Sequence, residues 1–288
     1  MNGILMLAKR NTLCFFRDKA SVVFSLMAVL IVIMLYLLFL RNLLVDSVLN
    51  GGLQFASDDQ VTNLIDSWVL AGILGIVSVT SSAGSLQCMV DDRITGKDLD
   101  FKITPMKTYQ LTTSYILSTF LVGMIMSAIT LAIALVFLYA TGCILEASSV
   151  VMCVVLLIPS TLSGSIIVFA LISFLKSQGA FSGFFTVLSV MIGFLTGIYM
   201  PMGNLPDAMQ VIGTLLPATH MAALFRQYLC SGSMADVFGP YDASEFRTEM
   251  GMDLHLGDFV FTPEISIIYV VAVTAVFFGI AVLIMRRK

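Results

Sequence analysis

Few side chains in this sequence could perform covalent chemistry, and they are not spaced as an active site requires. The two histidines, His220 and His255, lie far apart and no H-E-x-x-H zinc motif occurs. The phosphate-binding pattern G-x-x-x-x-G-K-[ST] is also absent, because the one Gly-Lys pair, Gly96-Lys97, is followed by Asp98. We therefore expect no catalytic residue, no metal site and no nucleotide hydrolysis in this chain.

Ionisable residues are nearly absent from the long apolar runs. Asp66 is the one acid near the start of such a run, and no Lys, Arg or His lies at the centre of one. Ionisable groups inside a membrane mark ion or proton pathways, so an ion-coupled carrier is disfavoured. His220, in the stretch L-L-P-A-T-H-M, is expected to be a polar residue at a membrane edge rather than a ligand.

The charged residues are concentrated instead in residues 88–110. Its charges of both signs are interleaved with apolar side chains: Asp91, Asp92, Arg93, Ile94, Lys97, Asp98, Leu99, Asp100, Phe101, Lys102 and Ile103. Pro105 should stop any helix there. A solvated connector is one interpretation, but it rarely needs so many apolar residues, so the pattern favours docking onto a partner.

The overall composition indicates the class of protein that must position these residues. Of the 288 residues, 58% are hydrophobic and 11% are charged, and the mean hydropathy is +0.99. Soluble domains carry about 25% charged residues, so a soluble enzyme is excluded. The net charge of -3 and pI of about 5.3 argue against a nucleic-acid partner.

The apolar runs are long and unbroken, which predicts spanning helices rather than a β-barrel. We predict an all-α membrane protein with six transmembrane helices over about 22–40, 64–87, 111–139, 150–174, 179–200 and 265–285. No small-residue cleavage site follows the first run, so it should remain as an anchor. Pro159 is expected to break the fourth span.

The positive charges predict the orientation of these spans. With both termini inside, every Lys and Arg except Arg41, Arg226 and Arg247 lies in an inner segment, as the positive-inside rule requires. Residues 1–20 are predicted to form an amphipathic helix on the inner face, or alternatively a plain basic flank.

Residues 201–263 form a long outer segment. Its first half, 201–232, is semi-apolar and broken by prolines, which fits short helices or a re-entrant hairpin. Its second half is polar and acidic and should form a water-facing cap. The five cysteines show no C-x-x-C spacing and are interpreted as apolar packing residues, although a Cys143–Cys230 disulfide on the outer side stays open.

Three segments together carry a family resemblance. They are Arg10-Asn11 with Phe16-Arg17-Asp18-Lys19 and Phe24-Ser25; Asp92-Arg93-x-x-Gly96-x-x-Leu99-Asp100-x-x-x-Thr104-Pro105; and Gly197-Ile198-Tyr199-Met200-Pro201, Leu205-Pro206 and Leu216-Pro217-x-Thr219-His220. In this order on a six-span frame, nearly the whole chain resembles the membrane (permease) subunit of type-2 ATP-binding-cassette (ABC) exporters. Asp92 replaces the usual Glu, Lys97 replaces a common Thr, and residues 233–262 are longer than expected.

This resemblance implies roles for particular residues. The loop between spans two and three would be a coupling helix on a separate ATPase, with Asp92, Arg93, Gly96, Lys97, Leu99, Asp100 and Pro105 as coupling residues. The path would lie between spans one, two and five, where span two offers Ser78, Thr80, Ser81 and Ser82 and span five offers Ser182, Thr186, Ser189 and Thr196. From these we select Ser78, Ser81, Ser82, Ser182, Thr186 and Ser189 as the substrate path, although small and hydroxyl residues also simply allow close helix packing. The outer gate would comprise Tyr199, Pro201, Pro206, Pro217 and His220.

The resemblance also implies partners and a location. It predicts two copies of an ATPase subunit that binds ATP and Mg, a second permease copy and membrane lipid, all at the bacterial cytoplasmic membrane. The expected activity is export of an amphipathic drug, antibiotic or small peptide. Export of a lipid-linked glycan, a non-transporting scaffold or sensor, and a secondary carrier are the alternatives.

Overall fold

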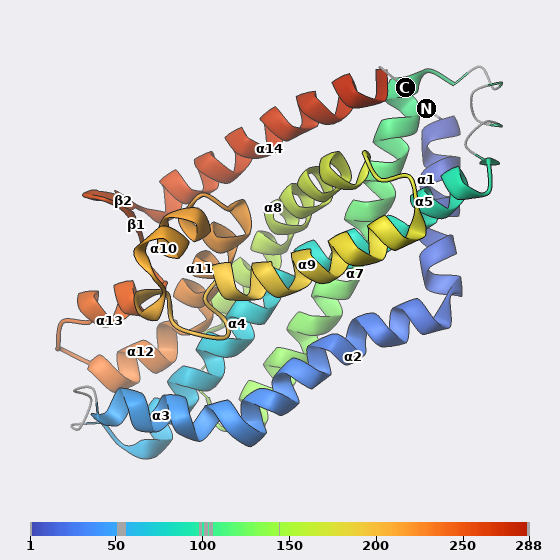
Figure 1. The fold of residues 1–288 in the computed structure, drawn as a ribbon. Coiled ribbons are helices and arrows are strands. Elements are labelled where there is room, and N and C mark those ends of the chain that lie inside the picture. Colours follow the sequence, from blue (N-terminus) through green and yellow to red (C-terminus); the bar gives the residue numbers. More distant parts are fainter. Residues whose placement is uncertain are drawn as a thin grey trace.

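Long helices account for nearly all of the apolar runs in the computed structural model, which describes residues 2–50, 56–97, 100, 103, 106–143 and 145–286 (Figure 1). The elements are α1 (Asn2–Arg17), α2 (Lys19–Leu35), a π-helical turn (Tyr36–Leu40), α3 (Arg41–Asn50), α4 (Asp58–Ser85), α5 (Gln87–Ile94), α7 (Thr108–Ala140), α8 (Ala147–Ile172), α9 (Gln178–Leu195), a 3-10 turn (Met202–Asn204), α10 (Asp207–Thr214), α11 (Pro217–Leu229), α12 (Ser231–Phe238), α13 (Ser244–Glu249), β1 (Leu254–Leu256), β2 (Phe259–Phe261) and α14 (Pro263–Arg286). Six helical stretches among these residues are long and apolar enough to cross a membrane. The prediction of an all-α, six-span membrane protein is confirmed.

Two of the helical spans extend beyond the bounds predicted for them. The first, expected over 22–40, continues through the π-helical turn to Asn50, and the second, expected over 64–87, runs from Asp58 to Ile94. Arg41, just after the expected end of the first span, and Asp92, just after that of the second, form ion pairs within the protein and do not end the helices. The first part of the expected loop 88–110 is therefore helical, as α5.

The expected break at Pro159 is also absent, because α8 continues through it from Ala147 to Ile172. Helix ends are set instead by caps. Asp18 caps α2 through the backbone N–H groups of Ala20 and Ser21, and Ser57 forms a capping box with Gln60 at the start of α4.

The helix α4 is the centre of the bundle and packs against α7, α8 and α11. Small residues allow this close packing: a Cβ added at Gly75 would lie 2.8 Å from the Cβ of Ala222 on α11, and one at Gly164 of α8 would lie 3.1 Å from the Ser78 carbonyl oxygen. Most of the second span's apolar window is buried, whereas only 12% of the first span's window and 17% of the sixth span's window are buried. The first and sixth spans are therefore peripheral.

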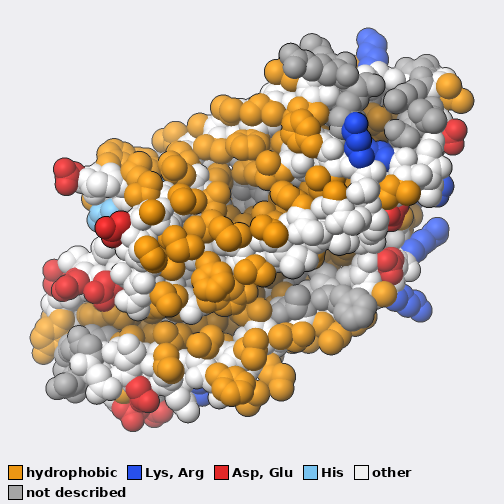
Figure 2. Space-filling view, viewed as in Figure 1, with side chains coloured by type: hydrophobic (Ala, Val, Ile, Leu, Met, Phe, Trp, Pro, Cys, Tyr) orange, Lys and Arg blue, Asp and Glu red, His pale blue; other side chains and the backbone are white. Residues whose placement is uncertain are grey.

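The two ends of the bundle differ in charge. Figure 1 places the start of α1 and the end of α14 at the same end, and α1 lies across that end. In Figure 2 most visible Lys and Arg side chains gather at this end, most visible acidic side chains gather at the other, and hydrophobic side chains cover the region between. We call these the basic end and the acidic end. The charge distribution predicts that the basic end faces the cytoplasm.

The segment between α9 and α14 contains the short helices expected over 201–232, and the axes of α10 and α11 differ by 88°. The expected polar cap contains α12, α13 and a two-stranded hairpin, in which His255 pairs with Val260. This cap is held to the bundle by buried apolar side chains and by a hydrogen bond of 2.7 Å from Trp68 Nε1 to the Met250 carbonyl oxygen. All five cysteines are free thiols, so Cys143 and Cys230 do not form a disulfide.

Candidate functional site

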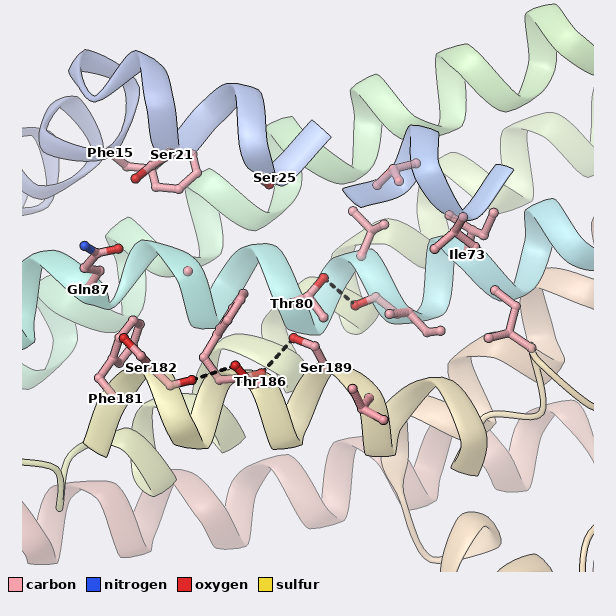
Figure 3. Close-up of a pocket in the computed structure, with 18 of the residues that line it drawn as sticks. Phe15, Ser21, Ser25, Ile73, Thr80, Gln87, Phe181, Ser182, Thr186 and Ser189 are labelled. Carbon is pink, nitrogen blue, oxygen red and sulfur yellow. Dashed lines mark hydrogen bonds between the residues drawn. The ribbon is translucent and has the colours of Figure 1, made fainter. Parts of the chain in front are cut away.

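A cavity of about 570 Å³ lies between α2, α4 and α9, with α1 contributing at its basic end. Figure 3 shows α4 between the other two helices, with Thr80 of α4 lying between Ser25 of α2 and Ser189 of α9. These are helices of the first, second and fifth spans. The cavity thus lies where the resemblance predicts the transport path.

Each helix contributes one face to the cavity. On α4 the lining residues include Ile76, Thr80 and Gly84, which recur every four residues, and on α9 they include Ser182 and Thr186. Residues four apart lie on the same side of a helix. The lining therefore consists of continuous stripes along the helices.

The predicted path residues divide between the cavity and the protein interior. All three from the fifth span, Ser182, Thr186 and Ser189, line the cavity. The three from the second span, Ser78, Ser81 and Ser82, are buried and do not line it.

Two of these buried serines join α4 to α8. The Ser160 hydroxyl donates to Ser78 Oγ at 2.8 Å, and Ser82 Oγ lies 3.1 Å from Ser165 Oγ. These contacts account for Ser78 and Ser82 as helix-packing residues. On α4 it is Thr80 that supplies the hydroxyl of the cavity wall.

The cavity lining is largely apolar, and the protons of several of its hydroxyl groups are already used in hydrogen bonds within the helices. Thr80 donates to the Ile76 carbonyl at 3.2 Å, Thr186 to the Ser182 carbonyl at 2.9 Å and Ser189 to the Phe185 carbonyl at 2.8 Å. These protons are used within the helices, so the hydroxyl oxygens offer mainly acceptor lone pairs to a guest. None of the lining residues that the structure describes is charged.

Several lining residues were not selected from the sequence. They are Ser21 and Ser25 on α2 and the aromatic residues Phe15, Phe181 and Phe185. Phe15 and Phe185 both approach Gly84, where an added Cβ would lie 3.9 Å from the ring of Phe185 and 4.0 Å from that of Phe15. The four-residue spacing of Ser21 and Ser25, which matches that of Ser182 and Thr186, is the sequence signal that could have identified them.

The predicted coupling residues lie at the basic end, and Asp92 points into the protein. Its side chain is 3% exposed. Both of its oxygens accept hydrogen bonds from the Arg10 guanidinium, with Nη2 to Oδ1 at 2.7 Å, and Oδ2 also accepts from the Tyr115 hydroxyl at 3.1 Å. Hydrogen bonding to Asp92 raises the pKa of Arg10 above its ordinary value, although partial burial lowers it. Asp92 therefore joins α5 to α1 and α7, two connections that single-sequence reasoning missed.

Arg93 connects the same segment to the end of the fourth span. Its Nη1 donates to the carbonyl oxygens of Ser173 at 2.8 Å and Leu175 at 3.1 Å, just beyond α8. Gly96 follows α5 with a φ of +75° and nothing within 4 Å of an added Cβ, so glycine suits the backbone conformation here rather than a close contact.

The remaining coupling residues divide by exposure. Lys97 and Asp100 are exposed, as is Ile94 at 50%. Leu99 and Pro105 lie outside the described residues. The surface at this end thus offers charged and apolar side chains, whereas Asp92 and Arg93 connect the segment to the helices.

Of the predicted gate residues, Tyr199 lines the cavity. Its ring stacks edge-on against Phe194, with centroids 5.1 Å apart. Pro201 and Pro206 precede short helical turns, and Pro217 is the first residue of α11. These prolines shape the backbone beyond the cavity.

His220 is fully buried, away from the cavity. Its Nε2 lies 2.8 Å from the Thr214 carbonyl oxygen, which can only accept, so Nε2 carries a proton. Its Nδ1 lies 3.2 Å from Ser266 Oγ, and its ring contacts Phe261 and Tyr269. His220 therefore joins α10, α11 and α14 as a packing residue.

The comparison with protein families agrees with this architecture. The sequence model of a family described as ABC-2 family transporter protein matches residues 46–283. The chain belongs to the ABC-2 transporter family. A search of the curated proteins finds no match. The protein is thus the membrane permease component of an ABC transporter, and its family implies association with an ABC ATPase subunit.

One further charged pair of this ABC-2 permease lies toward the acidic end. Asp66 of α4 is fully buried and accepts hydrogen bonds from Arg41 Nε at 3.0 Å, Arg41 Nη2 at 2.6 Å and the Tyr36 hydroxyl at 2.6 Å. Tyr36 begins the π-helical turn and Arg41 follows it. The one acid that sequence analysis placed near a span therefore holds the first span against the second.

Proposed function

We propose that this permease exports an amphipathic molecule, such as a drug, antibiotic or small peptide, across the bacterial cytoplasmic membrane at the expense of ATP. ATP and Mg would be bound by two copies of a separate ATPase subunit, and a second permease copy, identical or related, would complete the path. The observation that supports this most directly is the uncharged cavity between α2, α4 and α9.

The lining of the cavity supports an amphipathic substrate. Burying an ion against apolar walls without a charged partner is costly, and the described part of the lining contains no such partner. Aromatic and aliphatic side chains would instead gain from contact with apolar surface. The hydroxyl oxygens and the Gln87 amide provide a few hydrogen-bonding positions for polar substituents.

The outer faces of the cavity walls support a second permease copy. Only 12% of the first span's apolar window and 22% of the fifth span's are buried within this chain. Both spans flank the cavity, so a partner seated on them would cover these faces and close the path between the two copies.

The basic end supports transmission from an ATPase. Exposed Ile94, Lys97 and Asp100 offer a mixed surface for docking. The adjacent Asp92 and Arg93 are bonded to α1, α7 and the end of α8. A displacement of the docking surface would therefore be carried directly to three membrane elements.

Tryptophan substitutions test the cavity as the path. Thr186→Trp places a large ring in the cavity, whereas Val276→Trp places the same ring on α14 of the sixth span, at a position that is 61% exposed and does not line the cavity. The assay is ATP-dependent efflux of amphipathic dyes such as ethidium and rhodamine 6G from vesicles that contain permease and ATPase.

We expect Thr186→Trp to reduce efflux at least tenfold while ATPase association is retained, and Val276→Trp to transport normally. Equal efflux by the two variants would contradict the cavity as the path. Efflux driven by an ion gradient without ATP would contradict the proposed energy source.

A further inference from the structure

Among the described residues that line the transport cavity, Gln87 carries the one side-chain amide. This residue begins α5, lies near the basic end of the cavity and is partly exposed (Figure 3). Its amide forms no hydrogen bond with any residue that the structure describes. Nε2 and Oε1 therefore provide free donor hydrogens and a free acceptor side by side in the cavity wall.

Other glutamines of the described chain use their amides within the fold. The side chains of Gln60, Gln210 and Gln227 donate to backbone carbonyl oxygens at 3.0, 2.8 and 2.7 Å. At Gln87 the partner must come from the contents of the cavity, either water or a guest. A guest that displaces the water without offering both an acceptor and a donor leaves the amide unpaired, which is unfavourable.

The backbone of a peptide offers this pair of groups along one edge. In an extended peptide each residue directs its N–H and its C=O to the same side, which is why paired strand residues exchange two hydrogen bonds. Gln87 can donate from Nε2 to that carbonyl and accept at Oε1 from that N–H. The hydroxyls of Thr80 and Thr186 cannot replace it, because their protons already bond to backbone carbonyls.

Aromatic side chains surround the same end of the cavity. Gly84, three residues before Gln87, also lines it, and the rings of Phe15 and Phe185 both approach this glycine. The ring of Phe181 stacks on Phe185, with centroids 6.1 Å apart. Figure 3 shows Phe15, Phe181 and Gln87 at one end of the cavity. An apolar side chain beside a backbone bound to Gln87 would therefore contact aromatic rings.

We infer that Gln87 makes the cavity selective for short apolar peptides, by pairing with the N–H and C=O of one residue while a neighbouring side chain contacts the phenylalanine rings. This inference rests on the proposed function, because it takes the cavity as the transport path. The volume of about 570 Å³ lies within the range of about 300–1,000 Å³ of small-ligand sites, which suits a short peptide rather than a long chain.

Two neutral fluorescent probes test this inference by equilibrium binding to the full-length permease in lipid nanodiscs. One is the coumarinylmethyl ester of acetyl-Leu-Leu, and the other is its analogue in which ester oxygens replace both peptide N–H groups. We expect the wild-type protein to bind the peptide about tenfold more tightly, which corresponds to about 1.4 kcal/mol, because the ester analogue leaves Oε1 of Gln87 without a donor.

Three variants separate the amide from the rest of the cavity. Gln87→Met keeps the length of the side chain but removes the amide, and it should bind both probes equally; Gln87→Leu serves the same purpose if that variant does not fold. Thr80→Val is the matched control on the same wall and should keep the tenfold preference, because its hydroxyl proton is already used. In ATP-dependent vesicle uptake, Gln87→Met should raise KM for the peptide with kcat unchanged.

Equal binding of the two probes by the wild-type protein, or no binding of either, would overturn the inference. A preference that persists in folded Gln87→Met, or that Thr80→Val reduces equally, would also overturn it. Efflux of amphipathic dyes without peptide selectivity would overturn only this inference, whereas selective peptide binding without ATP-dependent efflux of any probe would overturn the proposed export and leave the Gln87 site in place.

Discussion

The buried Asp92 allows a quantitative prediction about how the coupling segment is held. Its carboxylate accepts two hydrogen bonds from Arg10 and one from Tyr115. A hydrogen bond to a charged group contributes about 1.5–3 kcal/mol net. The Arg10 side chain is 38% exposed, so solvent screening reduces its attraction to the carboxylate. We therefore expect a coupling free energy between Arg10 and Asp92 of about 2 kcal/mol in a double-mutant cycle.

The thiol of Cys88 can report this free energy. Cys88 lies one helical turn before Asp92 on α5, is 8% exposed and contacts Cys14 of α1. In a Cys14→Ser background, maleimide should reach Cys88 only when α1 separates from α5, and Cys143, Cys153 and Cys230 are buried elsewhere. Where opening is fast relative to labelling, the labelling rate reports the local opening equilibrium.

The cycle compares Arg10→Gln, Asp92→Asn and the double variant. Each single substitution should accelerate Cys88 labelling, and the double variant should fall short of the product of the two effects by roughly 30-fold, which corresponds to about 2 kcal/mol. Tyr115→Phe should have an effect of about 1.5 kcal/mol, at the lower end of the range for a hydrogen bond to a charged group, because the donor that it removes is neutral.

Exposed residues of the same segment serve as controls. Asp100→Asn should leave Cys88 labelling unchanged while reducing binding of the ATPase, because Asp100 lies on the surface. Multiplicative effects of Arg10→Gln and Asp92→Asn, with a coupling below about 0.5 kcal/mol, would refute the interpretation of Asp92 as the joint between α1 and α5.

Three further predictions concern the same helices. Arg41→Gln should destabilise the fold by about 3–5 kcal/mol because it leaves a fully buried carboxylate unpaired, whereas Asp66→Asn should cost less because Arg41 is 30% exposed; unfolding in mixed detergent measures both. Gly75→Ala should cost about 1–3 kcal/mol through collision with a side chain of α11, and Gly84→Ala, with its nearest neighbour at 3.9 Å, should not. The pKa of Asp18 is lowered from 3.8, chiefly by a hydrogen bond from a serine hydroxyl, so its cap on α2 should be fully present above pH 3.8 and lost as the pH falls through the lowered value. Amide exchange at the start of α2 should show this acid dependence, and Asp18→Ala should abolish it.

The number and order of the spans were predictable, because helix length and hydropathy alone determine which segments can cross a membrane. The ends of the first two spans could not be predicted in this way. Charges such as Arg41 normally mark the water boundary, and here its partner Asp66 lies 25 residues away along the chain. Arg10 and Asp92 are 82 residues apart. Pairing over such distances leaves no local pattern in one sequence.

Only some of the residues that line the cavity could be predicted from the sequence, for a related reason. Residue type identifies a hydroxyl on a span but not the face of the helix that it occupies in the bundle. Ser78 and Thr80 were equal candidates, yet Ser78 faces α8 and Thr80 faces the cavity. The difference depends on where α8 packs, which follows from contacts such as the close approach of Gly164 to Ser78. The apolar window of the fifth span is only 22% buried. Few neighbouring helices therefore cover the face that carries its hydroxyl groups.

The two ion pairs with buried carboxylates, Arg10–Asp92 and Arg41–Asp66, explain how a sparsely packed helix can form one wall of the cavity. The helical run from α4 through α5 is bonded to Arg41 of α3 toward one end and to Arg10 of α1 at the other. Between these points lies α2, which contributes Ser21, Ser25 and further residues to the cavity but belongs to a span whose apolar window is 12% buried. The elements on either side of α2 are thus held by charge-assisted hydrogen bonds, whereas α2 itself has little packing to hold it in place. Because few buried contacts permit local motion at low free-energy cost, we expect this wall, within a single copy of the chain, to move relative to α4 while both ion pairs stay formed.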